Sequence, residues 1–410
     1  MTRIPRHGVA LACAFVAVAT LAGQETPAPA PSFTLSEVVA RALASDAGIA
    51  ASQAQRVAAQ SGVSGARRWD DPVLAVEGAR HDEPEDDPWR LRVALSQRVV
   101  LPRARHADVT ARQAEAAEVD ALIALRQWEV VREVGDLAMT VRAADGRVAA
   151  LVEEEQAVSR LLSVVRERVG SGQATTSDLL LAQVEGLELQ GRVALARHEA
   201  LAARARLARR VGLSAADVGA IASETDGMIP DLATVIAAAG RHPTVRVAEA
   251  VVATRRAARM ALDPLVPEWQ VGVFAERDGD ANEAGIALDL PLPAWNRNRA
   301  GRIGASARMH AAIAEVAAAR QRAEAEAEAA WYAVEVARVR VEQLDRDVIP
   351  VLTEARRLAE ADWAAGSRTL DTVLNAQRSL TRLRGEQTDA RAAWARAYLA
   401  LTAAAAVEIP

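Results

Sequence analysis

The sequence contains little cysteine, few aromatic residues and no cluster of basic charge. Its 410 residues include one cysteine, Cys13, and only 3% Phe, Trp and Tyr. A single thiol excludes a disulfide framework, and so few aromatic side chains do not build a bulky globular core. No block of Lys or Arg occurs and the net charge is -5, which excludes the electrostatic footprint of a nucleic-acid-binding protein.

Motifs for catalysis and for cofactor binding are also missing. The sequence has no Walker loop, dinucleotide fingerprint, nucleophile elbow or paired-histidine motif. The six histidines are scattered without the spacing of metal ligands. We therefore expect no enzyme activity, no cofactor and no metal site in the chain itself.

The N-terminus has the pattern of an export signal. Arg3 and Arg6 precede an apolar run, Val9–Leu21, which is shorter than the roughly 20 residues of a transmembrane helix. Small residues and a Pro-rich stretch follow. The pattern predicts a cleaved signal peptide at residues 1–23 and a linker at residues 24–32.

The remaining chain repeats itself at a spacing of about 195 residues, which predicts two structural repeats, 33–229 and 230–410. Two pairs of segments carry this duplication. The first pair is Leu35–Gln60 with Leu232–Ala257, and the second is Gly172–Gln183 with Gly366–Gln377.

Long helices dominate each repeat. No proline occurs between Pro102 and Pro230, and apolar residues recur every three or four positions from Val130 to Val169, as in a coiled coil. A helix over 103–169 would be roughly 100 Å long at 1.5 Å per residue. The second repeat carries a similar seam, at Val334, Ala337, Val341, Leu344, Val348, Val351, Ala355 and Leu358. Pro350 lies inside that seam and predicts a kink.

Each long helix is expected to fold back at a tight turn, at about 170–177 and about 365–371. Gly170, Gly172 and Gly366 are suited to the left-handed conformation that ends a helix. The returning helices are about half as long as the outgoing ones, so the amphipathic segments starting at Leu35 and Leu232 should cover the rest. The acidic runs at 153–155 and 324–328 are interpreted as solvated helix faces.

Four short segments alternate between apolar and polar residues, at about 72–80, 89–101, 268–277 and 284–293. The alternation fits a half-buried sheet of a soluble protein, but the lengths are near those that cross a bilayer at a tilt. Four tryptophans flank the segments as an interfacial belt would: Trp69, Trp89, Trp269 and Trp295. Four transmembrane strands cannot close a barrel, so several identical chains would have to share one.

The duplication, the strand pairs and the hairpin turns resemble the outer-membrane factors of the TolC family. The stretch Leu290–Gly301 (LPLPAWNRNRAG) is similar to the CzcC and CusC branch, which serves heavy-metal efflux. The resemblance implies a mainly α fold, in which a homotrimer forms an α-helical periplasmic tunnel and a shared 12-stranded β-barrel in outer-membrane lipid. It also implies a passive exit duct for metal cations in a Gram-negative outer membrane, with a periplasmic adaptor and an inner-membrane resistance-nodulation-division (RND) pump as partners.

The resemblance also implies roles at the hairpin tips. Arg368 matches a linking arginine, Ser177 and Asp178 match its partners, and Trp363 matches an aromatic partner. Asp371 and Asn375 lie near two gate carboxylates, although the acid is displaced by one residue and the second acid is replaced by an amide. The alternative is that Asp178 and Asp371 only cap the returning helices.

Two other functions fit parts of the same pattern. One is a TolC-like channel for drug efflux or type I protein secretion. The other is a periplasmic coiled-coil adaptor without a pore, which would have a single hairpin inserted in a small β-rich domain.

Overall fold

The computed structural model describes residues 33–80, 89–219, 221–222, 229–263, 268–278, 281–291 and 297–405. The expected signal peptide at 1–23, the linker at 24–32 and Trp295 lie outside the described residues.

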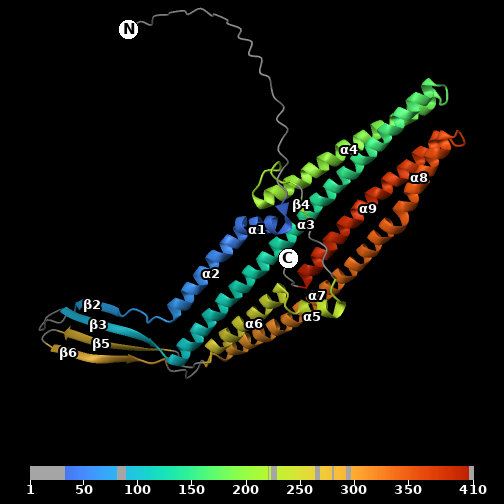
Figure 1. Cartoon of the computed structure of the whole chain (residues 1–410). Coiled ribbons are helices and arrows are strands. Elements are labelled where there is room, and N and C mark those ends of the chain that lie inside the picture. Colours follow the sequence, from blue (N-terminus) through green and yellow to red (C-terminus); the bar gives the residue numbers. More distant parts are fainter. Residues whose placement is uncertain are drawn as a thin grey trace, which may run out of the picture.

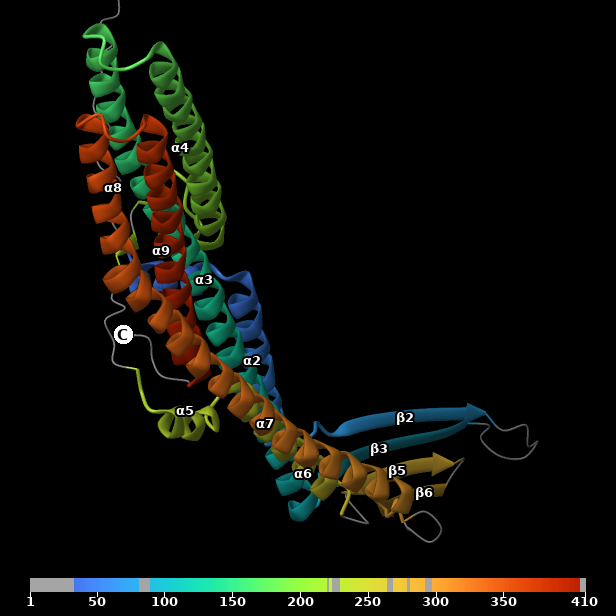
Figure 2. The same cartoon turned by 90° about the vertical axis from the view of Figure 1, so that its right-hand side faces the viewer.

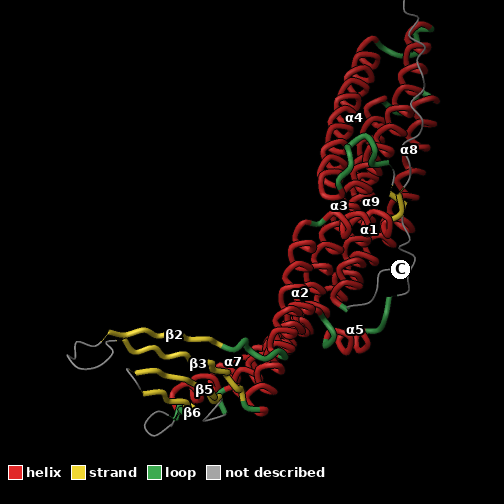
Figure 3. Tube along the Cα trace, turned by 90° about the vertical axis from the view of Figure 1, so that its left-hand side faces the viewer, coloured by secondary structure: helices red, strands yellow, loops and turns green. Residues whose placement is uncertain are grey.

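The described residues form a long helical rod with a small sheet at one end and two hairpin tips at the other (Figures 1 and 3). The helices are α1 (Leu35–Ser45), α2 (Ala47–Ala66), α3 (Pro102–Gly170), α4 (Thr176–Val211), α5 (Leu232–Ala239), α6 (Pro243–Ala261), α7 (Arg299–Gln343), α8 (Ile349–Ala364) and α9 (Leu370–Ala404). The predicted mainly α fold with long antiparallel hairpins is confirmed. Within these ranges no helix combines the length and apolar character needed to cross a membrane.

Helix α3 is the continuous 69-residue rod that the absence of proline predicts. Pro102 starts it, because a proline in the first turn sacrifices no helical hydrogen bond. Val130, Val134, Val141 and Val158 of its predicted seam are buried. α3 as a whole packs against α2 and α6 toward the sheet and against α4 and α9 toward the tips (Figure 1).

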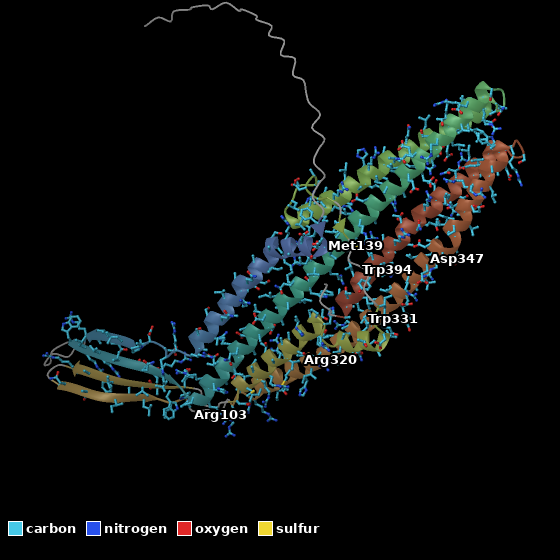
Figure 4. All side chains as sticks on the ribbon, viewed as in Figure 1. Arg103, Met139, Arg320, Trp331, Asp347 and Trp394 are labelled. Carbon is cyan, nitrogen blue, oxygen red and sulfur yellow. The ribbon has the colours of Figure 1, made fainter. Side chains whose placement is uncertain are left out.

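Two apolar clusters hold the middle of the rod together. One surrounds Met139 of α3 and includes residues of α1, α4 and α9. The other is rich in alanine, which lets α5, α7 and α9 approach closely, with Trp331 and Trp394 packed at its margin (Figure 4). The parallel pair β1 (Phe33–Thr34) and β4 (Ile221–Ala222) ties the start of the first repeat to the segment after α4.

A π-helical turn, Leu344–Val348, lies between α7 and α8, directly before Pro350. Proline has no N–H to donate and its ring crowds the preceding turn, so a wider turn accommodates it without ending the helix. The helix changes direction here (Figure 2), as the prediction of a kink at Pro350 requires.

This π turn makes part of the predicted second seam wrong. Val351 and Leu358 are 67% and 49% exposed, whereas Ala359 and Trp363 are buried. The π turn adds one residue, and one residue rotates an α-helix by about 100°. The buried face of α8 is therefore displaced by one position from the sequence pattern.

The four-stranded sheet is antiparallel with the order β2-β3-β5-β6. Its strands are β2 (Val73–Arg80), β3 (Trp89–Val100), β5 (Glu268–Asp278) and β6 (Ala281–Asp289). β6 starts about three residues before its predicted position, because backbone pairing continues through Asp278 and Ala281 although the side chains there are polar or small. The strand ends at Asp289.

One face of the sheet is apolar and the other is polar, as the alternation predicts. Leu74 pairs with Leu95, and Leu95 pairs with Val273, so these side chains share one face. They are 64%, 46% and 56% exposed. The apolar face is therefore uncovered within the described part of the chain.

Asp46 is a buried junction between four helices. It ends α1 and caps α2 by accepting a 2.7 Å hydrogen bond from the Ile49 N–H. Arg126 of α3 and Arg210 of α4 donate to its other oxygen at 3.1 and 2.8 Å. Burial by itself raises the pKa of Asp46, but the Ile49 hydrogen bond and the two arginines outweigh burial, and the net shift of the pKa is downward.

We predict that Asp46→Ala lowers the free energy of unfolding by about 3–5 kcal/mol, because two guanidinium groups lose their buried partner. Thermal denaturation followed by circular dichroism measures the loss. Because the folded pKa is depressed, the Asp46 contribution is present above the ordinary aspartate pKa and is lost as the pH falls through the folded value. Asp231→Ala, which removes an exposed helix cap, is the matched control with a smaller effect. Equal losses in the two variants would contradict the role of Asp46 as a junction.

Candidate functional site: the hairpin tips and the ion pairs behind them

The two hairpin tips lie side by side at the end of the rod away from the sheet (Figures 1 and 2). The turns occupy residues 171–175 and 365–369, between the paired helices. Gly172 and Gly366 have φ angles of 73° and 78°, the left-handed conformation expected for them. Gly170 instead remains helical as the last residue of α3.

The first tip is closed by a capping box. Asp178 accepts hydrogen bonds from the Thr175 N–H at 2.9 Å and from its hydroxyl at 2.8 Å, and Thr175 Oγ1 accepts from the Asp178 N–H at 3.1 Å. Asp178 therefore caps the returning helix α4, as the alternative to a role in gating predicts. Ser177 is exposed beside it.

The second tip is built differently. Thr369 precedes α9 without a side-chain cap, and the exposed Asp371 accepts a 2.9 Å hydrogen bond from Asn375 Nδ2. The two predicted gate residues are thus brought together. Arg368 is exposed in the turn and forms no hydrogen bond or ion pair with any residue that the structure describes.

Arg168 links the two tips within the chain, although no motif in the sequence points to it. It leaves the last turn of α3 and stacks over the ring of Trp363 at 4.6 Å. Its guanidinium also donates to the carbonyl oxygens of Trp363 and Ala364 at 3.3 and 3.0 Å. Trp363, 8% exposed, is therefore the aromatic partner of Arg168 in this chain.

A second link lies farther from the tips and contains two buried carboxylates. Glu154 of α3 is 1% exposed. It accepts a 2.7 Å hydrogen bond from the guanidinium of Arg384 of α9 and a second hydrogen bond from Gln377. Glu185 of α4 is 3% exposed and accepts a 2.7 Å hydrogen bond from the guanidinium of Arg378 of α9. These ion pairs join the hairpin of the first repeat to the returning helix of the second.

The interpretation of the acidic run at 153–155 as a solvated face is wrong for Glu154. Burial raises the pKa of Glu154, while the charges of Arg384 and Arg356 oppose that shift. The sequence offered only a weak signal for this burial, because Glu154 lies four residues before the buried Val158 on the same face of α3. Glu324, Glu326 and Glu328 are exposed, as expected.

The tryptophans near the sheet lie at both ends of the strands. Trp269 is near the start of β5 and pairs with Val99, whereas Trp89 starts β3 at the opposite end. Trp69 precedes β2 and is 59% exposed, with Arg105 stacked 4.0 Å from its ring centre. Trp89 and Trp269 are 59% and 39% exposed. Neither the sheet nor the tips hold three or more potential metal ligands together in the described residues.

The fold is that of outer-membrane channels. The structure of CusC, a protein whose folding and transmembrane channel formation involve conformational changes, matches with a TM-score of 0.77 and 14% identity over 90% of this chain and 91% of that chain. The outer-membrane channel OprN matches with a TM-score of 0.75 and 18% identity, over 90% of this chain and 89% of that chain. The outer membrane protein VceC of Vibrio cholerae matches with a TM-score of 0.74 and 15% identity, over 90% of this chain and 95% of that chain.

The sequence profile of the outer membrane efflux protein family matches residues 235–407. These residues make up most of the second predicted repeat. No curated protein sequence matches this chain. The family match and the shared fold together support the predicted outer membrane factor.

We predict that Arg384→Ala lowers the free energy of unfolding by about 3–5 kcal/mol, because it leaves Glu154 buried without its guanidinium. Arg382→Ala is the matched control, since Arg382 is 68% exposed and, among the described residues, pairs only with Glu386 on the same helix. Thermal denaturation in detergent compares the two variants. A loss of the same size for Arg382→Ala would argue against a special role for the buried pair.

The pH dependence of Glu154→Gln gives an independent test. Because the folded pKa of Glu154 is raised, wild-type stability from this group is fully present below the ordinary glutamate pKa and declines as the pH rises through the folded value. The glutamine variant lacks this decline. The difference in melting temperature between wild type and variant should therefore shift in favour of the variant as the pH rises, and a pH-independent difference would contradict the raised pKa.

Proposed function

We propose that the chain is the outer-membrane channel of a tripartite efflux system, a passive duct formed by three identical copies. The observation that carries the proposal is the sheet: four strands, apolar and exposed on one face, polar on the other, joined to a helical rod. The family profile over residues 235–407 and the shared fold support it. A transport channel of this kind performs no catalysis.

The need for several copies follows from the edges of the sheet. β2 and β6 each pair on one side only within the described residues. Unpaired backbone groups are not tolerated in hydrocarbon, and four strands are too few to close, since small barrels need about eight. Three copies supply twelve strands with the apolar faces toward lipid, and Trp69, Trp89 and Trp269 then lie at the two membrane interfaces.

The rods then continue the barrel as a periplasmic tunnel. The tips form its inner end, where a periplasmic adaptor connects the duct to an inner-membrane RND pump. The adaptor alternative predicts a single hairpin, whereas this chain has two hairpins and a four-stranded sheet. It is therefore not favoured.

Divalent or heavy-metal cations are the proposed cargo. Support comes from the stretch Leu290–Gly301, which resembles the CzcC and CusC branch, and from Asp371, whose exposed carboxylate would form a ring of three at the tips. Growth of a deletion strain on Co, Zn, Cd, Cu and Ag salts, beside common drugs, tests the cargo. Sensitivity to drugs alone would favour the drug-efflux alternative.

Cysteine scanning along β3 tests the membrane orientation. Cys13 is the only cysteine and lies in the predicted signal peptide, so the mature chain has no thiol. Val93→Cys lies on the apolar face and Ala94→Cys on the polar face of the same strand. In reconstituted vesicles, a charged maleimide should label position 94 and spare position 93, while a lipid-soluble maleimide should label position 93. Equal labelling by the charged reagent would contradict a lipid-facing apolar surface.

Arg368→Ala tests the tips. Arg368 is exposed and has no partner among the described residues of its own chain, so we place its contacts across the boundary between neighbouring copies. Loss of these contacts should loosen the tips and raise ion conductance in planar bilayers. Arg368→Lys, which keeps the charge, is the control and should stay close to wild type. Unchanged conductance of the alanine variant would remove this role from Arg368.

A further inference from the structure

The polar face of the sheet carries a row of charged residues across all four strands. Glu77 of β2 pairs in register with Arg92 of β3, Arg92 pairs with Glu276 of β5, and Glu276 pairs with Glu283 of β6. Side chains at paired positions point to the same face. The row therefore places three carboxylates and one guanidinium side by side across the sheet.

The centre of the row is a built cluster. Glu276 is 8% exposed although it lies on an otherwise accessible face. Arg90 hydrogen-bonds to it, and Arg92 Nε lies 3.8 Å from its second carboxylate oxygen. The guanidinium of Arg92 also lies 4.7 Å from the ring centre of Phe274. Two arginines and one aromatic ring thus immobilise Glu276.

Phe274 supports this cluster from the neighbouring row. That row consists of Ala75, Ala94, Phe274 and Gly285, so Phe274 is its one large side chain. A Cβ on Gly285 would lie 2.7 Å from the Phe274 ring, so the absence of a side chain there makes room for the ring. The ring lies across the sheet toward β6, with the Arg92 guanidinium packed on it.

The outer members of the row lie on the two edge strands of the sheet. Glu77 and Glu283 are exposed, and neither forms an ion pair with a described residue. The row itself has three carboxylates and one arginine, and the neighbouring Arg90 is balanced by Asp278 at 3.9 Å, so an excess of two negative charges remains in each chain. Charges of one sign on the wall of a narrow aqueous passage raise the local concentration of counter-ions.

We propose that the row Glu77, Arg92, Glu276 and Glu283, supported by Phe274, is a selectivity belt that favours cations in the sheet-lined part of the channel. The inference rests on the proposed function, because only a closed barrel turns the polar face into a passage. Glu77 and Glu283 set the charge of the belt. Arg92 limits the negative charge of the belt. Phe274 and Arg92 together set the width of the passage at the belt.

Reversal potentials in planar bilayers under a KCl gradient test the belt on the full mature chain. Wild type should prefer K⁺ to Cl⁻. The double variant Glu77→Gln/Glu283→Gln should lower the permeability ratio by at least about twofold, and Arg92→Gln should raise it. Arg277→Gln is the matched control, because Arg277 pairs with Leu91 on the apolar face and carries the same charge change outside the passage. Phe274→Ala should raise the single-channel conductance.

The outcomes separate the two proposals. If no variant and no wild-type sample forms channels, the proposed function fails. If channels form but the glutamine double variant keeps the wild-type permeability ratio, the duct stands and the belt is overturned, leaving the row as a structural ion-pair network only. A change in the permeability ratio of Arg277→Gln as large as that of Arg92→Gln would also overturn the belt.

Discussion

The structure depends on covering one very long helix. α3 has 69 residues and the helix that returns beside it, α4, has 36, so about half of the length of α3 needs other partners. Marginal helices gain most of their stability from packing of an apolar face. Here α2 and α6 cover the part near the sheet, and α9 adds to the cover toward the tips.

Buried charge, in addition to apolar packing, joins the two repeats. Glu154 and Glu185 meet arginines of α9, and Arg168 reaches Trp363 at the tips. Such pairs require accurate geometry, because a buried carboxylate without its partner is costly. They lie where the two hairpins contact each other, in addition to the apolar packing between them. The tips proposed as the gate lie directly beyond these links.

Periodic features were the most predictable from sequence. The run without proline predicted α3, the glycines predicted the two left-handed turns, and alternation predicted the two faces of the sheet. The seam of α8 was mispredicted, because hydrophobic period alone does not reveal a π turn before Pro350. Glu154 was mispredicted because its partners, Gln377 and Arg384, are more than 200 residues away in the chain.

The sequence by itself determined the helix lengths, the turn positions and the in-out alternation of the strands, because these depend on residues that are neighbours along the chain. Which charges are buried, and which lie in one row across the sheet, depends on contacts between segments that are distant in the chain. Glu77, Arg92, Glu276 and Glu283 come from four strands and meet through register. Register depends on pairing between distant segments, and a shift of one residue would move every side chain to the other face.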